Sequence, residues 1–214
     1  MTDYEEITRS IHTNLKLDYG LLTEEFQEQV MSVKYLKGHE KVLEIGGNIG
    51  RNSMIIAYIL SKHNNNNFVC LESNTDDAMK LKHNRDLNGF NFHIENAALS
   101  QRRLIQCGWQ TRPSDVDIDG WKQINTITWS ELQNKYNITF DTLVLDCEGA
   151  FYYILYDTPE ILNNVNKILM ENDFIDVPEH KGFVHETLKN NGFVVDYERA
   201  YSHYHDFYQV WLRV

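Results

Sequence analysis

The sequence has few of the features that mark a secreted, membrane-spanning or disulfide-stabilised protein. Its three cysteines, Cys70, Cys107 and Cys147, are odd in number and widely spaced, which argues against a disulfide framework or a zinc cluster. No apolar run approaches membrane-spanning length. The first residues, Met1 to Glu6, are acidic and polar and do not resemble a signal peptide. We therefore expect an intracellular, cytoplasmic protein without a membrane partner.

Positive charge is also scarce. The net charge of −11 makes a nucleic-acid backbone an improbable partner, because binding to phosphates depends on basic side chains. The length of 214 residues, with 42% hydrophobic and 24% charged residues, suits one soluble domain with a full core. No internal repeat and no second domain are visible, so residues 1–214 are expected to form a single domain.

The glycine-rich turn that follows the apolar run 42–45 lacks the marks of two common nucleotide sites. A dinucleotide turn would need glycines where Asn48 and Arg51 stand, and no Lys-Ser or Lys-Thr pair follows, as a P-loop requires. The turn is instead preceded by the carboxylate of Glu44, which would repel phosphate but can pair with an ammonium group, directly or through water. S-adenosylmethionine carries an ammonium group and no phosphate. We assign this turn to cofactor binding, with the candidates Glu44, Gly46, Gly47, Asn48 and Gly50.

The rest of the chain alternates between strand and helix patterns, which predicts an α/β fold with a mostly parallel sheet and helices on both faces. The two final strands are too close in sequence for a crossover helix, so they are expected to pair antiparallel. The seven expected strands are 41–45, 68–72, 91–95, 142–146, 167–171, 193–197 and 207–212. Helices are expected at 51–60, 75–87, 130–136 and 182–190, with another ending at 156.

Two further segments surround this core. Residues 1–38 are expected to form a helical lid, with helices at 4–15 and 23–36, ahead of the core at 39–214. Thr23, followed by Glu24 and Glu25, resembles a capped helix start. Residues 101–127 are irregular and are predicted to be a hairpin or loop insertion.

Four of the expected strands carry a carboxylate at or beside their end: Glu44, Glu72, Asp146 and Glu171. In an open parallel sheet the ligand lies beyond the carboxyl ends of the strands, so these side chains should line one crevice.

Their positions suggest roles in cofactor binding. Glu72 follows Gly50 by 22 residues, the position from which an acid accepts ribose hydroxyls. Ser73, Asn96 and Ala97 are expected beside the adenine. Asp146 is expected at the reacting centre, in the middle of the sheet, and is also counted among the cofactor-binding residues.

These segments resemble the FkbM family of S-adenosylmethionine-dependent methyltransferases. The resemblance covers about residues 38–192: the turn 42–50, the segments 71–74, 87–89, 96–100 and 126–132, and most specifically Asp146-Cys147-Glu148-Gly149-Ala150, which is similar to the family's D-x-E-G-A segment. It departs at Glu44, where the family usually has aspartate, at Gly47, and at Phe151, where the family commonly has an acid. The resemblance implies a Rossmann-like class I methyltransferase fold and methyl transfer to oxygen, often on a sugar or a natural-product hydroxyl.

A hydroxyl acceptor must lose its proton as the methyl group is transferred, which requires a base or an orienting group. Asp146 or Glu148 is the expected base, with Glu171 as a third catalytic candidate. We expect no metal. In the alternative, Asp146 with Glu171 and Asn172 would offer oxygen ligands to magnesium.

The acceptor is expected to be a small molecule or a glycan. An aromatic, histidine-containing loop is expected to contact it, because aromatic faces stack on sugar rings. That loop holds Tyr201, His203, Tyr204, His205 and Tyr208. Trp109, Trp121, His180 and His185 are further candidates.

Three other functions stay open at this point. The acceptor could be a small non-sugar metabolite, which nothing in the residues separates from a sugar. The chain could also be a binding protein that kept the fold and lost the chemistry, although the four carboxylates argue against that. An RNA methyltransferase is disfavoured by the net acidity.

Overall fold

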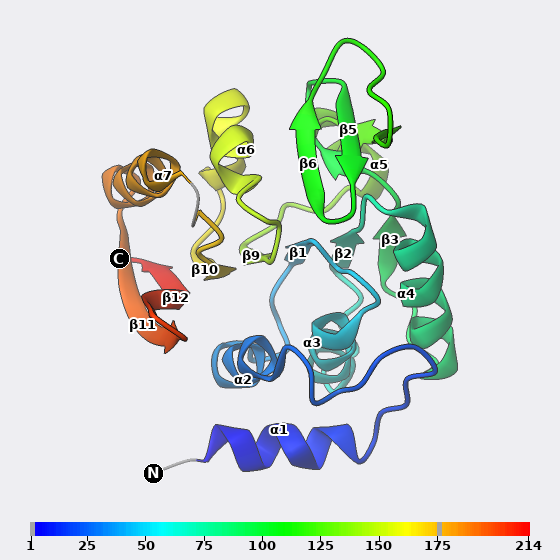
Figure 1. Ribbon diagram of the computed structural model, residues 1–214. Helices are drawn as coiled ribbons and strands as arrows, with labels where there is room; N and C mark the ends of the chain where they lie inside the picture. Colours follow the sequence, from blue (N-terminus) through cyan, green and yellow to red (C-terminus); the bar gives the residue numbers. More distant parts are fainter. Residues whose placement is uncertain (1–2, 175–176) are drawn as a thin grey trace.

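The computed structural model describes residues 3–174 and 177–214, and its centre is a seven-stranded sheet in the order β11-β12-β10-β9-β1-β2-β3 (Figure 1). Strands β1, β2, β3, β9 and β10 are parallel, and β12 lies antiparallel between β10 and β11. This is the predicted sheet. The strands are β1 (Val42–Ile45), β2 (Phe68–Leu71), β3 (His93–Glu95), β9 (Thr142–Leu145), β10 (Lys167–Glu171), β11 (Phe193–Tyr201) and β12 (Tyr204–Arg213).

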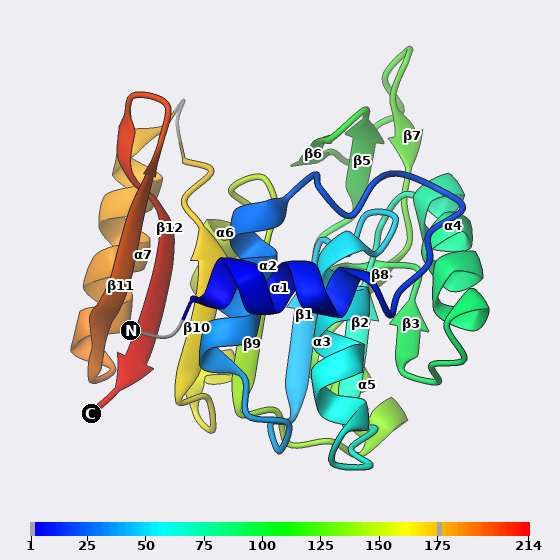
Figure 2. The same cartoon turned by 90° about the horizontal axis from the view of Figure 1, so that it is seen from below.

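Helices cover both faces of the sheet, as the alternating pattern predicted (Figures 1 and 2). One face carries α2 (Phe26–Tyr35), α3 (Arg51–Ser61) and α4 (Thr75–Leu87), with α1 (Tyr4–His12) packed outside α2. The other face carries α5 (Trp129–Tyr136), α6 (Phe151–Asp157), the short 3₁₀ helix η1 (Pro159–Leu162) and α7 (Pro178–Asn190).

The core is divided by the alternation of side chains along the central strands. In β1, Leu43 and Ile45 pack toward α5, α6 and α7, whereas Val42 packs toward α2 and α3. All four residues of β1 are buried, because this strand lies between β2 and β9 with helices above and below it. Burial on both faces accounts for the nearly continuous apolar run seen in the sequence.

The insertion predicted at residues 101–127 is a small antiparallel sheet that extends beyond the carboxyl edge of the main sheet (Figure 2). Its strands are β5 (Leu104–Cys107), β6 (Gln110–Pro113) and β7 (Lys122–Gln123). Two short parallel strands, β4 (Ala98–Leu99) and β8 (Thr126–Ile127), hold its base together.

Several predicted boundaries are wrong; among them, α1 ends at His12 rather than at 15, and α7 begins at Pro178 rather than at 182. Helix α2 starts at Phe26 rather than at Thr23, because Glu24 and Glu25 form ion pairs with Arg51, each at 2.6 Å, instead of beginning a helix. The loop predicted between the last two strands is almost entirely strand, since β11 and β12 continue to Tyr201 and Tyr204.

In the part of the chain that the structure describes, no helix combines the length and the apolar character needed to traverse a bilayer. Residues 1–2, part of the acidic start considered above, and residues 175–176 lie outside the described residues. The division of the domain into a lid at 1–38 and a core at 39–214 stays a prediction.

Candidate active site

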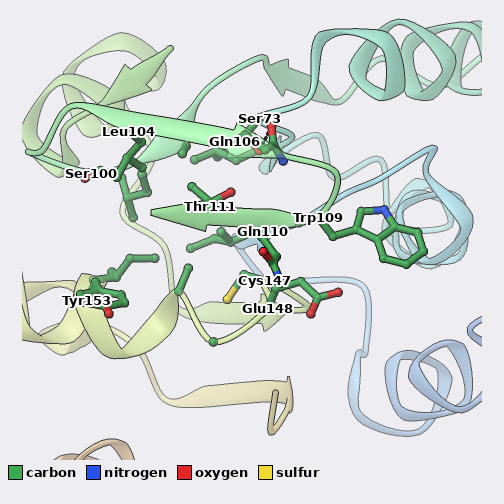
Figure 3. Close-up of a pocket in the computed structure, with 18 of the residues that line it drawn as sticks. Ser73, Ser100, Leu104, Gln106, Trp109, Gln110, Thr111, Cys147, Glu148 and Tyr153 are labelled. Carbon is green, nitrogen blue, oxygen red and sulfur yellow. Dashed lines mark hydrogen bonds between the residues drawn. The ribbon is translucent and has the colours of Figure 1, made fainter. Parts of the chain in front are cut away.

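A cavity of about 840 Å³ lies at the carboxyl edge of the central strands. Its wall combines the turns that follow β1, β2, β9 and β10 with the hairpin β5–β6 of the insertion. In Figure 3 the strand with Gln110 and Thr111 crosses the cavity, between Ser73 and Gln106 on one side and Cys147 and Glu148 on the other. Ligand sites commonly have volumes of about 300–1,000 Å³, so this cavity is large enough for a cofactor with part of an acceptor.

Gly46 is required where the turn after β1 meets the segment after β9. Its φ is 92°, and a Cβ atom there would lie 1.6 Å from the carbonyl oxygen of Asp146. The backbone N–H of Asp146 donates to the carbonyl of Ile45 at 3.1 Å. The predicted cofactor turn and the predicted catalytic segment are therefore in direct backbone contact, although 100 positions separate Gly46 from Asp146.

Gly47 and Gly50 do not belong to the cavity wall, contrary to their prediction as cofactor contacts. A Cβ atom on Gly47 would lie 2.1 Å from the sulfur of Cys70, and one on Gly50 would lie 2.4 Å from Leu81 of α4. Both glycines let the turn pack closely on β2 and α4. Their role is to position Gly46 and Asn48, which do line the cavity.

Glu44 also points away from the cavity. Its side chain belongs to the face of β1 covered by α3, is 3% exposed, and accepts a hydrogen bond from the Ser53 hydroxyl at 2.5 Å. Burial raises the pKa of this carboxyl to about 7. The predicted direct pairing of Glu44 with a ligand ammonium group is therefore not available in this structure.

Glu72 lies in the cavity wall, as predicted. Its two carboxylate oxygens accept hydrogen bonds from the backbone N–H groups of Asn48 and Asn74, both at 2.7 Å. Each oxygen can accept a further bond, because a carboxylate offers about four lone-pair directions. The side chain is thus fixed in place and can still bind two hydroxyl groups.

Ser73 and Ala97 line the cavity beside Glu72, but Asn96 does not. The Asn96 amide donates to the carbonyl oxygens of Glu72 at 2.8 Å and Ser73 at 3.3 Å. Asn96, predicted as a cofactor contact, instead ties the end of β3 to the end of β2.

Asp146 and Glu148 line the cavity together with Asp173, which the sequence analysis missed. Gly149 makes this possible, because a Cβ atom there would lie 2.9 Å from the carbonyl oxygen of Asp173. Glu148 adopts a left-handed φ of 50°, which is uncommon for a residue other than glycine. Burial, followed by the nearby charge of Glu148, raises the pKa of Asp173 to about 7.

Glu171 lies outside the cavity wall but close to Asp146. One carboxylate oxygen from each of Glu171, Asp146 and Glu28 lies within 4.8 Å of the others. Burial, followed by the negative charge of the neighbouring carboxylates, raises the pKa of Asp146 and of Glu28 well above their usual ranges. Glu28 comes from α2. Nothing in the sequence indicated that it belongs to the site, because the position of a single acid in a helix does not show toward which part of the protein its side chain points.

Asn172 is not available as the magnesium ligand considered in the sequence analysis. Its amide nitrogen donates to the carbonyl of Asp206, and its amide oxygen lies 3.1 Å from Nε2 of His185. The carboxylate that lies close to both Asp146 and Glu171 is that of Glu28. His185 is accordingly held at Asn172, outside the cavity wall.

The aromatic residues of the cavity come from the insertion, α6, α7 and the segment after β10 rather than from the β11–β12 hairpin. Trp109 and Trp121 line the cavity, as does His180, which stacks on Tyr152 with ring centres 3.6 Å apart. Tyr153 of α6 lines it too and was missed. The predicted contact loop contributes nothing to this wall; it comprises Tyr201, His203, Tyr204, His205 and Tyr208.

The fold is shared with methyltransferases of known structure. A methyltransferase from Pyrococcus furiosus is similar with a TM-score of 0.55 and 14% identity, over 98% of this chain and 96% of that chain. An O-methyltransferase from Bacillus cereus, solved in complex with SAH, is similar with a TM-score of 0.54 and 14% identity, over 100% and 92%. A ribosomal protein L11 methylase from Lactobacillus delbrueckii subsp. bulgaricus has a TM-score of 0.55 and 11% identity, over 93% and 83%.

No protein-family model and no curated protein sequence matches this chain. The structural matches establish the Rossmann-like methyltransferase fold, with its mostly parallel sheet and one antiparallel strand near the edge. The narrower resemblance to the FkbM family stays a prediction.

Proposed function

We propose that this protein is an S-adenosylmethionine-dependent O-methyltransferase. The observation that carries the proposal is a single cavity in which the turn after β1, Glu72, Ala97 and Asp146 meet. These groups come from four different elements, and each lies where a Rossmann-like sheet binds its ligand, beyond the carboxyl ends of the strands. The presence of SAH in the Bacillus cereus relative supports the same cofactor here.

In this proposal the cofactor lies across the turn after β1. The free lone pairs of Glu72 accept the ribose hydroxyls, and Ser73 and Ala97 lie against the adenine. Gly46 and Asn48 contact the methionine part of the cofactor. S-adenosylmethionine carries no phosphate, and its sulfonium and ammonium charges outweigh its one carboxylate, so the acidic character of the wall is no obstacle to binding.

The proposed acceptor is a hydroxyl group of a sugar or glycan. Transfer forms an oxygen–methyl bond and breaks the sulfur–methyl bond, while the hydroxyl proton passes to a carboxylate of the protein. Asp146 and Glu148 line the cavity and are the proposed proton acceptor and orienting group. The raised pKa of Asp146, caused mainly by burial, makes its carboxylate a stronger base than an exposed one.

Methyl transfer from labelled S-adenosylmethionine to a panel of glycans and nucleotide sugars tests this proposal. We expect Asp146→Asn to lower turnover by about 100-fold or more, the usual contribution of a positioned base. Calorimetric titration with S-adenosylmethionine provides the control, since Asp146→Asn and Glu148→Gln should both still bind it. Full turnover in both variants, with normal binding, would remove these residues from the mechanism.

A metal-assisted version of the same reaction is favoured by one observation, the grouping of Glu28, Asp146 and Glu171. Three carboxylates form the hard oxygen set that suits magnesium, which would lower the pKa of a bound hydroxyl. Activity that persists in excess chelator supports the carboxylate base, whereas loss of activity that magnesium restores supports the metal.

Two alternatives are separated by simple measurements. If methyl transfer occurs to a small non-sugar hydroxyl compound and not to sugars, the proposed acceptor is wrong, but the proposed reaction, O-methyl transfer, still holds. No binding of S-adenosylmethionine in calorimetry would leave a binding protein that retains only the fold.

A further inference from the structure

One wall of the cavity is unusually rich in carboxyl groups. Asp146, Glu148 and Asp173 all line it, brought together by the backbone contact between Gly149 and Asp173. One carboxylate oxygen of Asp173 is buried and, among residues 3–174 and 177–214, meets no hydrogen-bond donor. We call Asp146, Glu148 and Asp173 the acidic wall.

The two arginines of the cavity do not neutralise this wall. Arg102 forms an ion pair with Asp157, whose two carboxylate oxygens each lie 2.5 Å from a guanidinium nitrogen. Arg112 belongs to the insertion strand β6, where its guanidinium lies 4.2 Å from the centre of the Trp121 ring. Within the described part of the chain, no member of the acidic wall forms an ion pair with either arginine.

A buried carboxylate oxygen without a protein donor, as in Asp173, is stabilised by a hydrogen bond from water or from a ligand. A hydroxyl or ammonium group of the acceptor would provide the missing hydrogen bonds. A phosphate or carboxylate on the acceptor would instead be repelled, and such like-charge contacts are a common means of rejecting a wrong partner.

Tyr153 supplies a complementary surface at the same cavity. Its ring lines the cavity from α6 and lies edge-on to His180, with ring centres 5.3 Å apart. The guanidinium of Arg102 also lies 5.6 Å from the centre of this ring. An aromatic ring in the same cavity as hydrogen-bond acceptors suits a ligand ring that has an apolar face and donors around its edge.

We propose that the acceptor is an uncharged or amino-bearing ring compound, whose hydroxyl or ammonium groups bind the acidic wall, and that acceptors with an anionic group beside the methylated position are rejected. The proposal rests on the proposed methyltransferase function, because it concerns the second substrate of the same cavity. It restricts the acceptors to molecules without an anionic group near the methylated position.

Two matched series test the acceptor. The sugar series compares a hexose with its 2-amino, 6-phosphate and uronic acid forms, in several configurations. The non-sugar series compares tyrosol, tyramine and 4-hydroxyphenylacetate. Transfer from labelled S-adenosylmethionine is measured, with binding to the protein–SAH complex by calorimetry. We expect the neutral or amino member of at least one series to be preferred over its anionic partner by about tenfold or more.

Asp173→Asn supplies the test of the wall itself. It should reduce the preference for the amino form over the neutral form by several-fold, and Asp115→Asn, an exposed change in the insertion, should not. The proposal is overturned if the anionic acceptors are preferred, or if none of the neutral and amino acceptors is bound or methylated. It is also overturned if Asp173→Asn leaves the preference for the amino over the neutral acceptor unchanged. Failure to bind S-adenosylmethionine would instead overturn the proposed function itself.

Discussion

Single residues in this protein show how the direction of a side chain decides its role. Glu44 and Glu72 are both acids at the ends of neighbouring strands, yet only Glu72 lines the cavity. Glu44 is the third residue of β1 and shares a face with Val42, so it points toward α3. Glu72 follows the last residue of β2, where the chain has left the sheet and can turn toward the ligand.

The buried carboxyl of Glu44 makes stability depend on pH. Its ordinary pKa is 4.5, and burial raises it to about 7 in the folded protein. The folded state therefore holds this proton more tightly, and the stability linked to it is lost as the pH rises from about 4.5 to about 7. Glutamine cannot lose a proton and can still accept the hydrogen bond from Ser53.

We therefore expect Glu44→Gln to gain stability relative to the wild-type protein as the pH is raised from 5 to 8. The gain should be up to about 3 kcal/mol, since one pKa unit corresponds to about 1.4 kcal/mol. Urea unfolding of the ligand-free protein at both pH values measures it. Glu186→Gln, at an exposed position on α7, is the matched control. The explanation would be contradicted if the difference in unfolding free energy between Glu44→Gln and the wild-type protein were the same at the two pH values.

At the scale of elements, the insertion between β3 and α5 gives the cavity one of its walls. Strands β5 and β6 are joined by a two-residue turn of Gly108 and Trp109, in which Gly108 has a φ of 59°. Trp109 lines the cavity and is nevertheless 73% exposed, so it contributes little to the packed core. A large aromatic side chain in this position is available to a ligand.

Trp109→Ala should consequently weaken ligand binding without destabilising the fold. We expect several-fold weaker binding of cofactor or acceptor, with the free energy of unfolding changed by no more than about 0.5 kcal/mol, as is usual for surface positions. Calorimetry and urea unfolding measure the two effects. Val116→Ala, 65% exposed in the same insertion and outside the cavity wall, serves as the control. Equal ligand affinity in Trp109→Ala and the wild-type protein would show that the turn has no part in binding.

Local sequence patterns predicted which segments form helices and which form strands, but they did not predict how these elements contact one another. The segment 75–87, which ends before Asn88 and Gly89, was predicted as a helix and forms α4 with the same bounds, and the run 167–171 predicted β10. The start of α2 was misplaced because Arg51, 26 positions beyond Glu25, takes the acids that resembled a helix start. The approach of Glu28 to Asp146 likewise depends on how α2 packs, which no local pattern contains.

At the scale of the whole molecule, the alternation of strands and helices was sufficient to predict one mostly parallel sheet with an antiparallel strand. It also placed the ligand at the carboxyl edge, where the cavity lies. Which strand ends share one cavity depends on the order of the strands. The sequence analysis placed Asp146 in the middle of the sheet, and the pairing of β1 with β9 brings it beside the cofactor turn.

The contact between Gly46 and Asp146 has a consequence for how the chain folds. Strand β1 must dock against β9, a segment about 100 residues later, before the cofactor turn acquires its shape. Such distant pairings form late, since a long loop has to close first. The N-terminal half of the chain, even as it leaves the ribosome, therefore has no finished binding site. A bound ligand therefore reports that β1, β2, β9 and β10 are assembled, and it stabilises only states in which they are.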